Sequence, residues 1–343
     1  MTDWYPLSSA QEHVVRLHAA DPTRLLQSTV RSFSVSGVDP DRLQRAVDAL
    51  VQRHEPLRTV YGDGQRILSA MDIPVRSAEF TPEPFDLTTG PLLRLSLSDN
   101  RLVVHAHLLV ADAWSWQVLC DDLSAAYRGV ELPELDRQYV DWALWHRDQP
   151  IAHLHSWWSQ RLSGAPITLP IPAPGTRGPG EACRPIRLNP GPRTNSVVLA
   201  TALARALGRR TGQSRLTIGL ATANRSRPEA HLMLGFFVHS VPLVVDLTAA
   251  DLTAYVSAAI TAAHDHNGIA FPPSQVNFVY HPHGALGQLH LDSPALEHHV
   301  PAPAKFPLTI RADDAFVRAE YAVDSVDAAW VDTLLDDLVE ELP

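Results

Sequence analysis

Cysteine is nearly absent from the chain. Only Cys120 and Cys183 occur among the 343 residues, and neither belongs to a Cys-x-x-Cys pair. Two cysteines are too few for the disulfide framework of a small secreted domain. We therefore expect both residues to be structural or incidental.

Long apolar runs are also absent. The sequence has no stretch of about 18 apolar residues, and its first residues do not form a charged segment followed by an apolar one. Neither a membrane-spanning helix nor a secretory signal is predicted. These absences lead us to expect a cytoplasmic protein without a membrane partner.

Positive charge is in the minority. The chain has 28 Lys and Arg against 38 Asp and Glu, for a net charge of -10. Nucleic-acid binding needs clustered Lys and Arg to contact the phosphates, and no basic patch with interleaved aromatic residues is evident. Nucleic acid is therefore not an expected partner.

The remaining composition is that of an ordinary soluble globular protein, with 45% apolar and 19% charged residues. Because 343 residues exceed the size of one simple core, two lobes are expected. Histidine is frequent, with 17 copies, and clusters at 264–266 and 281–283. Zinc ligands occur at such spacings, but no third and fourth ligand can be identified. We expect solvated loop histidines and no bound metal.

Residues 1–162 carry a mixed pattern of helices and strands and form the expected N-terminal lobe. Capping residues and helical apolar spacing predict helices at about 9–19 and 40–53. Alternation and an Asp63-Gly64 turn predict strands at 30–35, 57–61, 65–68, near 92–95 and at 102–107.

Proline and glycine are densest at 163–192, which we interpret as a connection between lobes rather than as an element. Residues 193–343 then form the expected C-terminal lobe. Its predicted helices are 197–207, 252–263 and 326–342, and its predicted strands are 216–220, 241–245, 275–280, 308–312 and 316–323.

The most informative segment is 104–115. It predicts an apolar strand that ends in His105 and His107, turns through Asp112 and enters a helix near Trp114. Ser115 is expected to cap this helix, and no Ser-His-Asp arrangement that would make it a nucleophile is evident. Polar groups in a turn after a strand are a common place for chemistry.

This segment resembles the His-His-x-x-x-Asp-Gly motif of the condensation domains of nonribosomal peptide synthetases, in the chloramphenicol acetyltransferase-like superfamily. With Asp112 aligned to the motif's Asp, His107 takes the first His, Leu108 the second and Ala113 the Gly. In that family the second His assists proton transfer during acyl transfer, which a leucine cannot do. The resemblance therefore implies a degenerate motif. A one-residue slip, with His107 in the second position and Ala111 as an insertion, is the alternative.

Other motifs of the family occur in the same order along the chain. The matching segments are Pro6-Leu7-Ser8-Ser9-Ala10-Gln11, Arg53-His54-Glu55-Pro56-Leu57-Arg58-Thr59, Tyr139-Val140-Asp141-Trp142-Ala143-Leu144-Trp145, Ile218-Gly219 with Asn224-Arg225-Ser226-Arg227-Pro228-Glu229, and Gly235-Phe236-Phe237-Val238-His239-Ser240. The resemblance implies an α/β (α+β) fold with two chloramphenicol acetyltransferase-like lobes forming a V around a central cleft or tunnel. The chain is shorter than such domains, and the shortening falls near 192–197 and 266–275.

The resemblance also implies roles for named residues. His107 and His239 are the catalytic candidates. His107 is either a polar group at the centre of the tunnel or a buried hydrogen-bonded histidine. His239 stands where the family has Asn near the active centre, and it either replaces the missing base or substitutes passively for the Asn's hydrogen bonds.

The other expected site residues are structural. The family's Asp pairs with an arginine, so Asp112 and Arg225 are expected to form a buried ion pair, because an unpaired buried charge is costly. Trp114, Ser115 and Asn224 are expected at the same site.

Two classes of function follow from the resemblance. The first is a condensing enzyme that forms an amide or ester from an acyl or peptidyl thioester tethered to a carrier protein, or performs an altered reaction such as cyclisation. The second is an inactive module that binds a carrier protein or recruits a tailoring enzyme, as a degenerate domain of glycopeptide synthetases does. Both imply no bound cofactor, with the phosphopantetheine arm of the carrier as the substrate tether.

Overall fold

Two units, each with its own sheet and hydrophobic core, make up the chain. The computed structural model describes all residues except 1–3, 24–26, 167, 174–178, 188–194, 270, 272–273, 283–286, 299 and 301–303. Unit 1 comprises Met1–Gln149, Arg225–Val238 and Gly284–Ala302. Unit 2 comprises Pro150–Asn224, His239–His283 and Pro303–Pro343.

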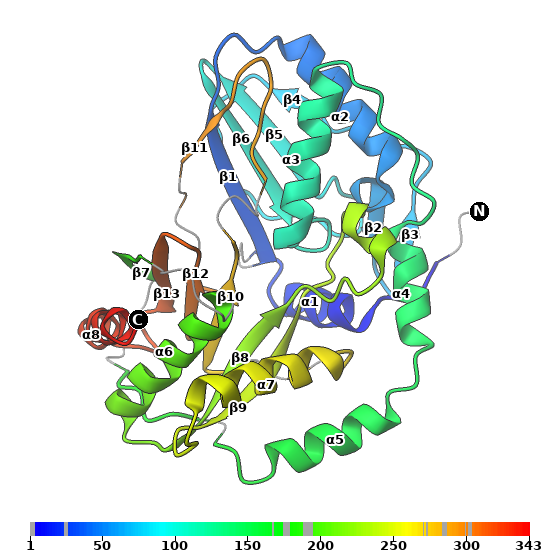
Figure 1. Cartoon of the computed structure of the whole chain (residues 1–343). Coiled ribbons are helices and arrows are strands. Elements are labelled where there is room, and N and C mark those ends of the chain that lie inside the picture. The colour runs from blue at the N-terminus through cyan, green and yellow to red at the C-terminus, as the bar shows by residue number, and fades with distance from the viewer. Residues whose placement is uncertain are drawn as a thin grey trace. The chain divides into compact units, whose positions relative to one another are not determined.

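Unit 1 is built on a five-stranded sheet with the order β11-β1-β6-β5-β4 (Figure 1). Its strands are β1 (Ser28–Ser34), β4 (Val75–Arg76), β5 (Leu93–Ser98), β6 (Arg101–His107) and β11 (Leu296–His298). Neighbouring strands are antiparallel, except that β4 and β5 are parallel. The strands predicted near 30–35, 92–95 and 102–107 are confirmed, with small shifts at their ends.

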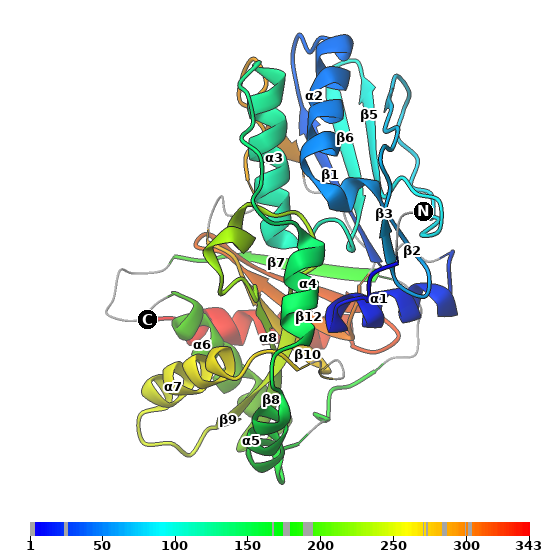
Figure 2. The same cartoon turned by 90° about the vertical axis from the view of Figure 1, so that its right-hand side faces the viewer.

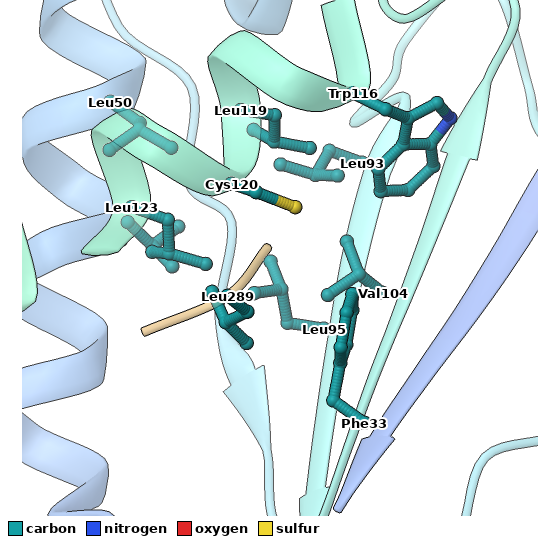
Figure 3. A pocket seen from close by; sticks show the side chains of 11 residues that line it. Phe33, Leu50, Leu93, Leu95, Val104, Trp116, Leu119, Cys120, Leu123 and Leu289 are labelled. Carbon is teal, nitrogen blue, oxygen red and sulfur yellow. The ribbon is translucent and has the colours of Figure 1, made fainter. Parts of the chain in front are cut away.

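Helices α2 (Pro40–Arg53) and α3 (Ala113–Tyr127) cover one face of this sheet (Figure 2). Asp39 caps α2, and Pro40 occupies its first turn, where the missing N–H would have no helical partner anyway. Figure 3 shows part of the core between helices and sheet, where apolar side chains leave a cavity of about 10 Å³. Because that volume holds about one water molecule, this cavity is not a substrate site.

The segment that carries β11 is attached to unit 1 by a charged pair as well as by its ladder. Arg31 of β1 is 4% exposed, and its Nε donates to Oε1 of Glu297 at 2.6 Å. A second N–H of Arg31 donates to the carbonyl of Gly287 at 3.1 Å. Residues 284–302 are therefore part of unit 1, although they lie far from its other residues in sequence.

Smaller elements complete unit 1. They are α1 (Ser9–Ala20), the 3-10 helices η2 (Glu55–Arg58) and η3 (Pro228–Leu232), the hairpin of β2 (Thr59–Tyr61) and β3 (Gln65–Ile67), and α4 (Tyr139–Arg147). Ser8 caps α1 in a capping box with Gln11. The hairpin predicted around Asp63-Gly64 is confirmed.

Unit 2 has a six-stranded sheet with the order β7-β13-β12-β10-β8-β9. Its strands are β7 (Pro179–Pro185), β8 (Arg215–Thr222), β9 (His239–Asp246), β10 (Val276–Tyr280), β12 (Leu308–Ala312) and β13 (Phe316–Ala322). Its helices are α5 (Ala152–Leu162), α6 (Asn195–Thr211), α7 (Leu252–Asp265) and α8 (Ala328–Glu340). Apolar residues of α6, α7 and α8 pack with those of the sheet in one core. Two ion pairs, Arg311–Glu320 and Arg318–Glu181, join side chains of β12, β13 and β7.

The units differ from the predicted lobes of 1–162 and 193–343. Helix α5 belongs to unit 2 because Leu154 and Trp158 pack into its core. The segment 163–192, predicted to contain no element, includes the edge strand β7, which pairs with β13. An edge strand tolerates proline at its ends because no neighbour needs the missing N–H.

Candidate functional site

The turn between β6 and α3 is organised by Asp112. This residue is the N-cap of α3, and its Oδ1 accepts the backbone N–H of Ser115 at 2.8 Å. The prediction that Ser115 caps the helix is therefore wrong. The carboxylate takes that position because its two oxygens satisfy the helix start and further donors together.

The buried ion pair predicted between Asp112 and Arg225 is present. Arg225 NH2 lies 3.0 Å from Asp112 Oδ1, and the two side chains are 1% and 2% exposed. Oδ2 of Asp112 accepts the N–H of Phe237 at 3.0 Å, and the Phe237 ring lies 3.8 Å from the guanidinium carbon. Burial lowers the pKa of Arg225, and Asp112 opposes that shift. Because this ion pair is so deeply buried, it holds the segment around Arg225 against the turn that contains Asp112.

Ser115 is saturated with hydrogen bonds inside this network. Its hydroxyl donates to the carbonyl of Gly235 at 2.8 Å and accepts from Arg225 NH2 at 2.7 Å and from the Gly235 N–H at 3.1 Å. The backbone N–H of Asp112 also donates to the Gly235 carbonyl, at 3.1 Å. With its proton donated to a carbonyl, Ser115 has a structural geometry and not that of an activated nucleophile.

Trp114 and Asn224 lie at the edges of the Arg225 loop. Trp114 is 38% exposed, and its indole N–H donates to the carbonyl of His231 at 3.0 Å. Asn224 directly precedes Arg225 and has a φ of 50°, a left-handed conformation that Asn adopts more readily than most residues. Neither residue provides a titrating group.

His107 is built into the end of β6. The residue is 2% exposed, and its Nδ1 accepts the N–H of Leu109 at 3.3 Å. Because Nδ1 accepts, the neutral ring carries its proton on Nε2. Its ring meets His18 and Phe85 edge-on, with centroids 5.6 Å and 5.7 Å apart. The geometry is that of a buried, hydrogen-bonded histidine, and the catalytic alternative stays a prediction.

His105 lies two residues earlier on the same side of β6. It is fully buried, and neither ring nitrogen has a hydrogen-bond partner in the described part of the chain. Phe80 and Phe85 pack against its ring at centroid distances of 5.4 Å and 4.5 Å. Burial, and then the nearby Arg94, lower the pKa of His105 to about 4, because desolvation disfavours the charged ring.

This buried ring predicts acid sensitivity. The unfolded chain takes up a proton at His105 near its ordinary pKa of about 6.5, while the folded protein does so only near 4. The free energy of unfolding should therefore fall as the pH drops from about 6.5 to about 4, by about 3 kcal/mol from this residue alone. Urea unfolding at a series of pH values measures this slope.

A His105→Phe variant is the matched control because it keeps an aromatic ring between Phe80 and Phe85. Its slope should be smaller than that of the wild type. Burial also lowers the pKa of His18, His54 and His146, so some slope remains. An identical pH dependence in the two proteins would rule out the contribution of His105.

His239 is the first residue of β9 and belongs to unit 2. It is 5% exposed and lies opposite Thr222 in the ladder. The Thr222 hydroxyl donates to the His239 carbonyl at 3.4 Å and accepts from Asn267 Nδ2 at 2.9 Å. The expected meeting of His239 with His107, which belongs to unit 1, stays a prediction.

Sequence reasoning named the Gly235 motif without assigning a role to the glycine. Gly235 has a φ of +145°, and a Cβ built on it would lie 2.1 Å from Cδ2 of Tyr139. The Tyr139 hydroxyl donates to the carbonyl of Phe236 at 2.6 Å and lies 2.8 Å from Ser8 Oγ. The close approach of backbone to ring, which only glycine permits, is the signal that the motif contained.

The described residues were compared with the requirements of a metal site and of a membrane-spanning helix. No cluster of three or more His, Cys, Asp and Glu that could hold a metal ion occurs among the residues with described positions. In the His264–His266 cluster, His266 stacks on Trp157 at 3.9 Å, and His283 lies outside the described residues. None of the helices in the described ranges is long and apolar enough to span a membrane.

Comparison with known proteins assigns the sequence to a family. The sequence model of the family described as "Condensation domain" matches residues 1–184. Phosphinothricin tripeptide synthetase PhsC of Streptomyces viridochromogenes is 30% identical over 388 aligned positions, which cover 90% of this chain and 36% of the relative. Chondramide synthase cmdD of Chondromyces crocatus is 31% identical over 336 positions, which cover 78% of this chain and 8% of the relative. The chain thus spans about a third or less of these two relatives.

The PhsC alignment is longer than the 343 residues of this chain. PhsC therefore carries segments that this chain lacks, in agreement with the expected shortening.

Solved structures share the fold. The condensation domain of the Monacolin K polyketide synthase MokA has a TM-score of 0.84 at 18% identity, covering 99% of this chain and 96% of that one. The X-domain from teicoplanin biosynthesis, solved in complex with OxyB, has a TM-score of 0.82 at 21% identity, covering 99% and 93%. The predicted mixed α/β fold with two lobes is confirmed. By the family match over more than half of its length, the chain belongs to the condensation domain family.

Proposed function

We propose that this chain acts on an acyl or peptidyl thioester tethered to a carrier protein and transfers the acyl group to an amine or hydroxyl. The family match over residues 1–184, which includes the intact Asp112 turn, carries this proposal. The relative PhsC is named as a tripeptide synthetase and cmdD as a synthase, which is consistent with it.

The chemistry requires few groups. The acceptor nitrogen or oxygen attacks the thioester carbonyl, a base takes the acceptor's proton, the C–S bond breaks and the carrier thiol leaves. Much of the rate of such a reaction comes from holding the two reactants in register. The buried network of Asp112, Ser115 and Arg225 supports that role, because it fixes the turn that follows His107.

We assign the proton-accepting role to His239. Leu108 occupies the position of the family's second His in our alignment and cannot accept a proton. His107 uses Nδ1 to accept the Leu109 N–H, which leaves this nitrogen without a role as a base. In the motif alignment His239 takes the position of the family's Asn near the active centre, so it is a further ionisable side chain there. Imidazole is the usual proton shuttle near neutral pH.

A second candidate function is recruitment without catalysis. Leu108 and the hydrogen-bonded burial of His107 favour it, because neither residue then needs to react. In this case the chain holds a carrier protein or a tailoring enzyme. The X-domain that was solved with OxyB is a precedent for a partner-binding role on this fold.

The experiment loads a carrier protein with an acyl group on its phosphopantetheine arm and supplies a small amine or alcohol. Product is measured for wild type, His107→Ala, His239→Asn and the double variant Leu108→His/His239→Asn. We expect wild type to be active and His239→Asn to be impaired. The double variant should regain transfer because it restores the family's base.

The alternatives give different results. A wild type that binds the loaded carrier or another partner without forming product supports recruitment and contradicts the enzymatic proposal. Full activity in His239→Asn together with its loss in His107→Ala would move the proton-accepting role to His107.

A further inference from the structure

A short aromatic segment, residues 4–6, lies along the β2–β3 hairpin of unit 1. Tyr5 pairs with Gln65 of β3 through both of its backbone groups, and the two N···O distances are 2.8 Å each. The side chain of Gln65 also donates to the carbonyl of Pro6, at 2.9 Å. These three hydrogen bonds fix the backbone of the segment against the hairpin.

Trp4 lies against the turn of this hairpin and is 47% exposed. A Cβ built on Gly62 would lie 3.3 Å from its ring, and one built on Gly64 would lie 2.4 Å from the carbonyl oxygen of Tyr5. The turn therefore accommodates the segment because these two positions have no side chain. The guanidinium carbon of Arg66 is 4.9 Å from the centroid of the Trp4 ring. The ring is thus held in place without a ligand, which lowers the entropic cost of binding one.

A hollow of about 350 Å³ lies beside this segment. It is lined by Trp4, Tyr5, Pro6, Asp63 and Gly64. Ligand sites commonly have volumes of about 300 to 1,000 Å³, so the hollow is large enough for part of a peptide. Tyr5 is 37% exposed and is, with Trp4, among the large apolar side chains that the surface exposes. The hollow therefore offers aromatic surface to a ligand.

The polar groups at the hollow restrict what it binds. Within the described part of the chain, the exposed carboxylate of Asp63 has no ion pair and the indole N–H of Trp4 has no acceptor. Both backbone groups of Tyr5 are engaged by Gln65, and Pro6 has no N–H, which disfavours the addition of a ligand strand at this edge. A ligand thus meets aromatic surface, one hydrogen-bond donor and one negative charge.

A proline-rich segment suits these groups. Proline has no N–H that requires an acceptor, and the polyproline II helix has no internal hydrogen bonds, so its carbonyls are available to a donor such as the Trp4 indole. Grooves lined by aromatic side chains are the usual receptors of such segments. The carboxylate of Asp63 complements a basic side chain beside the prolines.

We propose that this hollow binds a proline-rich peptide segment that carries a basic residue, with the prolines against Trp4 and Tyr5 and the basic side chain at Asp63. The inference rests on residues of unit 1 alone and does not depend on the proposed function.

Fluorescence anisotropy tests the proposal with the full chain and three labelled peptides. The first peptide has an arginine followed by a run of prolines. The second replaces the arginine by glutamate, and the third replaces the prolines by alternating glycine and serine. We expect the first to bind. The second should bind about fivefold more weakly because its charge repels Asp63, and the third at least about tenfold more weakly because it has no preformed helix.

Two pairs of variants locate the site. Trp4→Ala should weaken binding of the arginine–proline peptide at least about tenfold. Phe316→Ala truncates an aromatic side chain of unit 2 with the same exposure of 47% and should leave binding unchanged. Asp63→Asn should abolish the preference for arginine over glutamate, whereas Asp99→Asn, at the exposed turn between β5 and β6, should keep it. Because Asp63→Asn changes only the charge of an exposed side chain, its result holds even where Trp4→Ala disturbs the segment.

Three results would overturn the proposal. One is no binding of the arginine–proline peptide, or equal binding of the glycine–serine peptide. Another is an equal effect of the two variants in either pair. The third is displacement of the peptide by free arginine at the same concentration, because the hollow would then bind the cation without the prolines.

Discussion

The Asp112→Ala variant is expected to lose about 3 to 5 kcal/mol of its free energy of unfolding. The substitution leaves the guanidinium of Arg225 buried, at 1% exposure, without its carboxylate. It also removes the acceptor of the Ser115 and Phe237 backbone N–H groups. Each of these donors is buried, so each loss carries a desolvation penalty. Urea unfolding, followed by tryptophan fluorescence, measures the change.

The double variant Asp112→Ala/Arg225→Met is the control for this result. It removes the uncompensated charge, so it should be less destabilised than the two single substitutions predict by addition. Unchanged thermal stability in Asp112→Ala would show that the ion pair does not support the fold. Strict additivity of the two substitutions would show that the two groups do not interact.

The Gly235→Ala variant is expected to lose about 3 kcal/mol or more, from backbone strain together with steric overlap. The φ of +145° is one that residues with a Cβ rarely adopt, and the added carbon would lie 2.1 Å from the Tyr139 ring. Tyr139 is 1% exposed and cannot move without losing its contacts with Trp142 and Phe237. The Gly235 carbonyl that holds Asp112 and Ser115 would shift with the backbone.

Gly37→Ala is the matched control for the glycine substitution. Gly37 also has a positive φ, of 66°, but nothing lies within 4 Å of an added Cβ. Its cost should be only the backbone strain of about 1 to 2 kcal/mol. Equal losses in the two variants would contradict the argument that Tyr139 fills the space beside Gly235.

Local chemistry made much of the fold predictable. The Asp39-Pro40 pair marks the start of α2 because a carboxylate cap and a proline without an N–H suit the first turn. The alternation of β12 separates the apolar core side of the sheet from its charged side, and its predicted bounds of 308–312 are those observed. These signals depend only on neighbours in sequence.

Strands that are held by partners far away in the sequence could not be predicted from local patterns. Strand β11 has three residues and is attached by its pairing with β1 and by Glu297, which meets Arg31 from far along the sequence. Strand β7 lies in a segment whose prolines favour a loop, and its pairing with β13 outweighs that tendency. Three residues carry too little periodicity to indicate a strand without their partner.

The site also has features that the sequence predicts and features that depend on distant residues. The pairing of Asp112 with Arg225 could be predicted from motif positions, because a buried carboxylate requires a cation. The helix cap could not, since Asp112 and Ser115 are both good capping residues and only the network decides between them. The burial of His105 between Phe80 and Phe85 depends on a loop that no local pattern places.

Whether the protein transfers acyl groups with His239 as the base is decided by one measurement. It compares the rate of acyl transfer from a loaded carrier protein between wild type and His239→Asn at saturating acceptor. The asparagine keeps a hydrogen-bonding side chain of similar size and removes the proton acceptor. Wild-type transfer should be well above the rate without protein, and the variant should be slower by about a hundredfold to ten-thousandfold. A wild-type rate equal to that without protein, or equal rates in the two proteins, would contradict this role of His239.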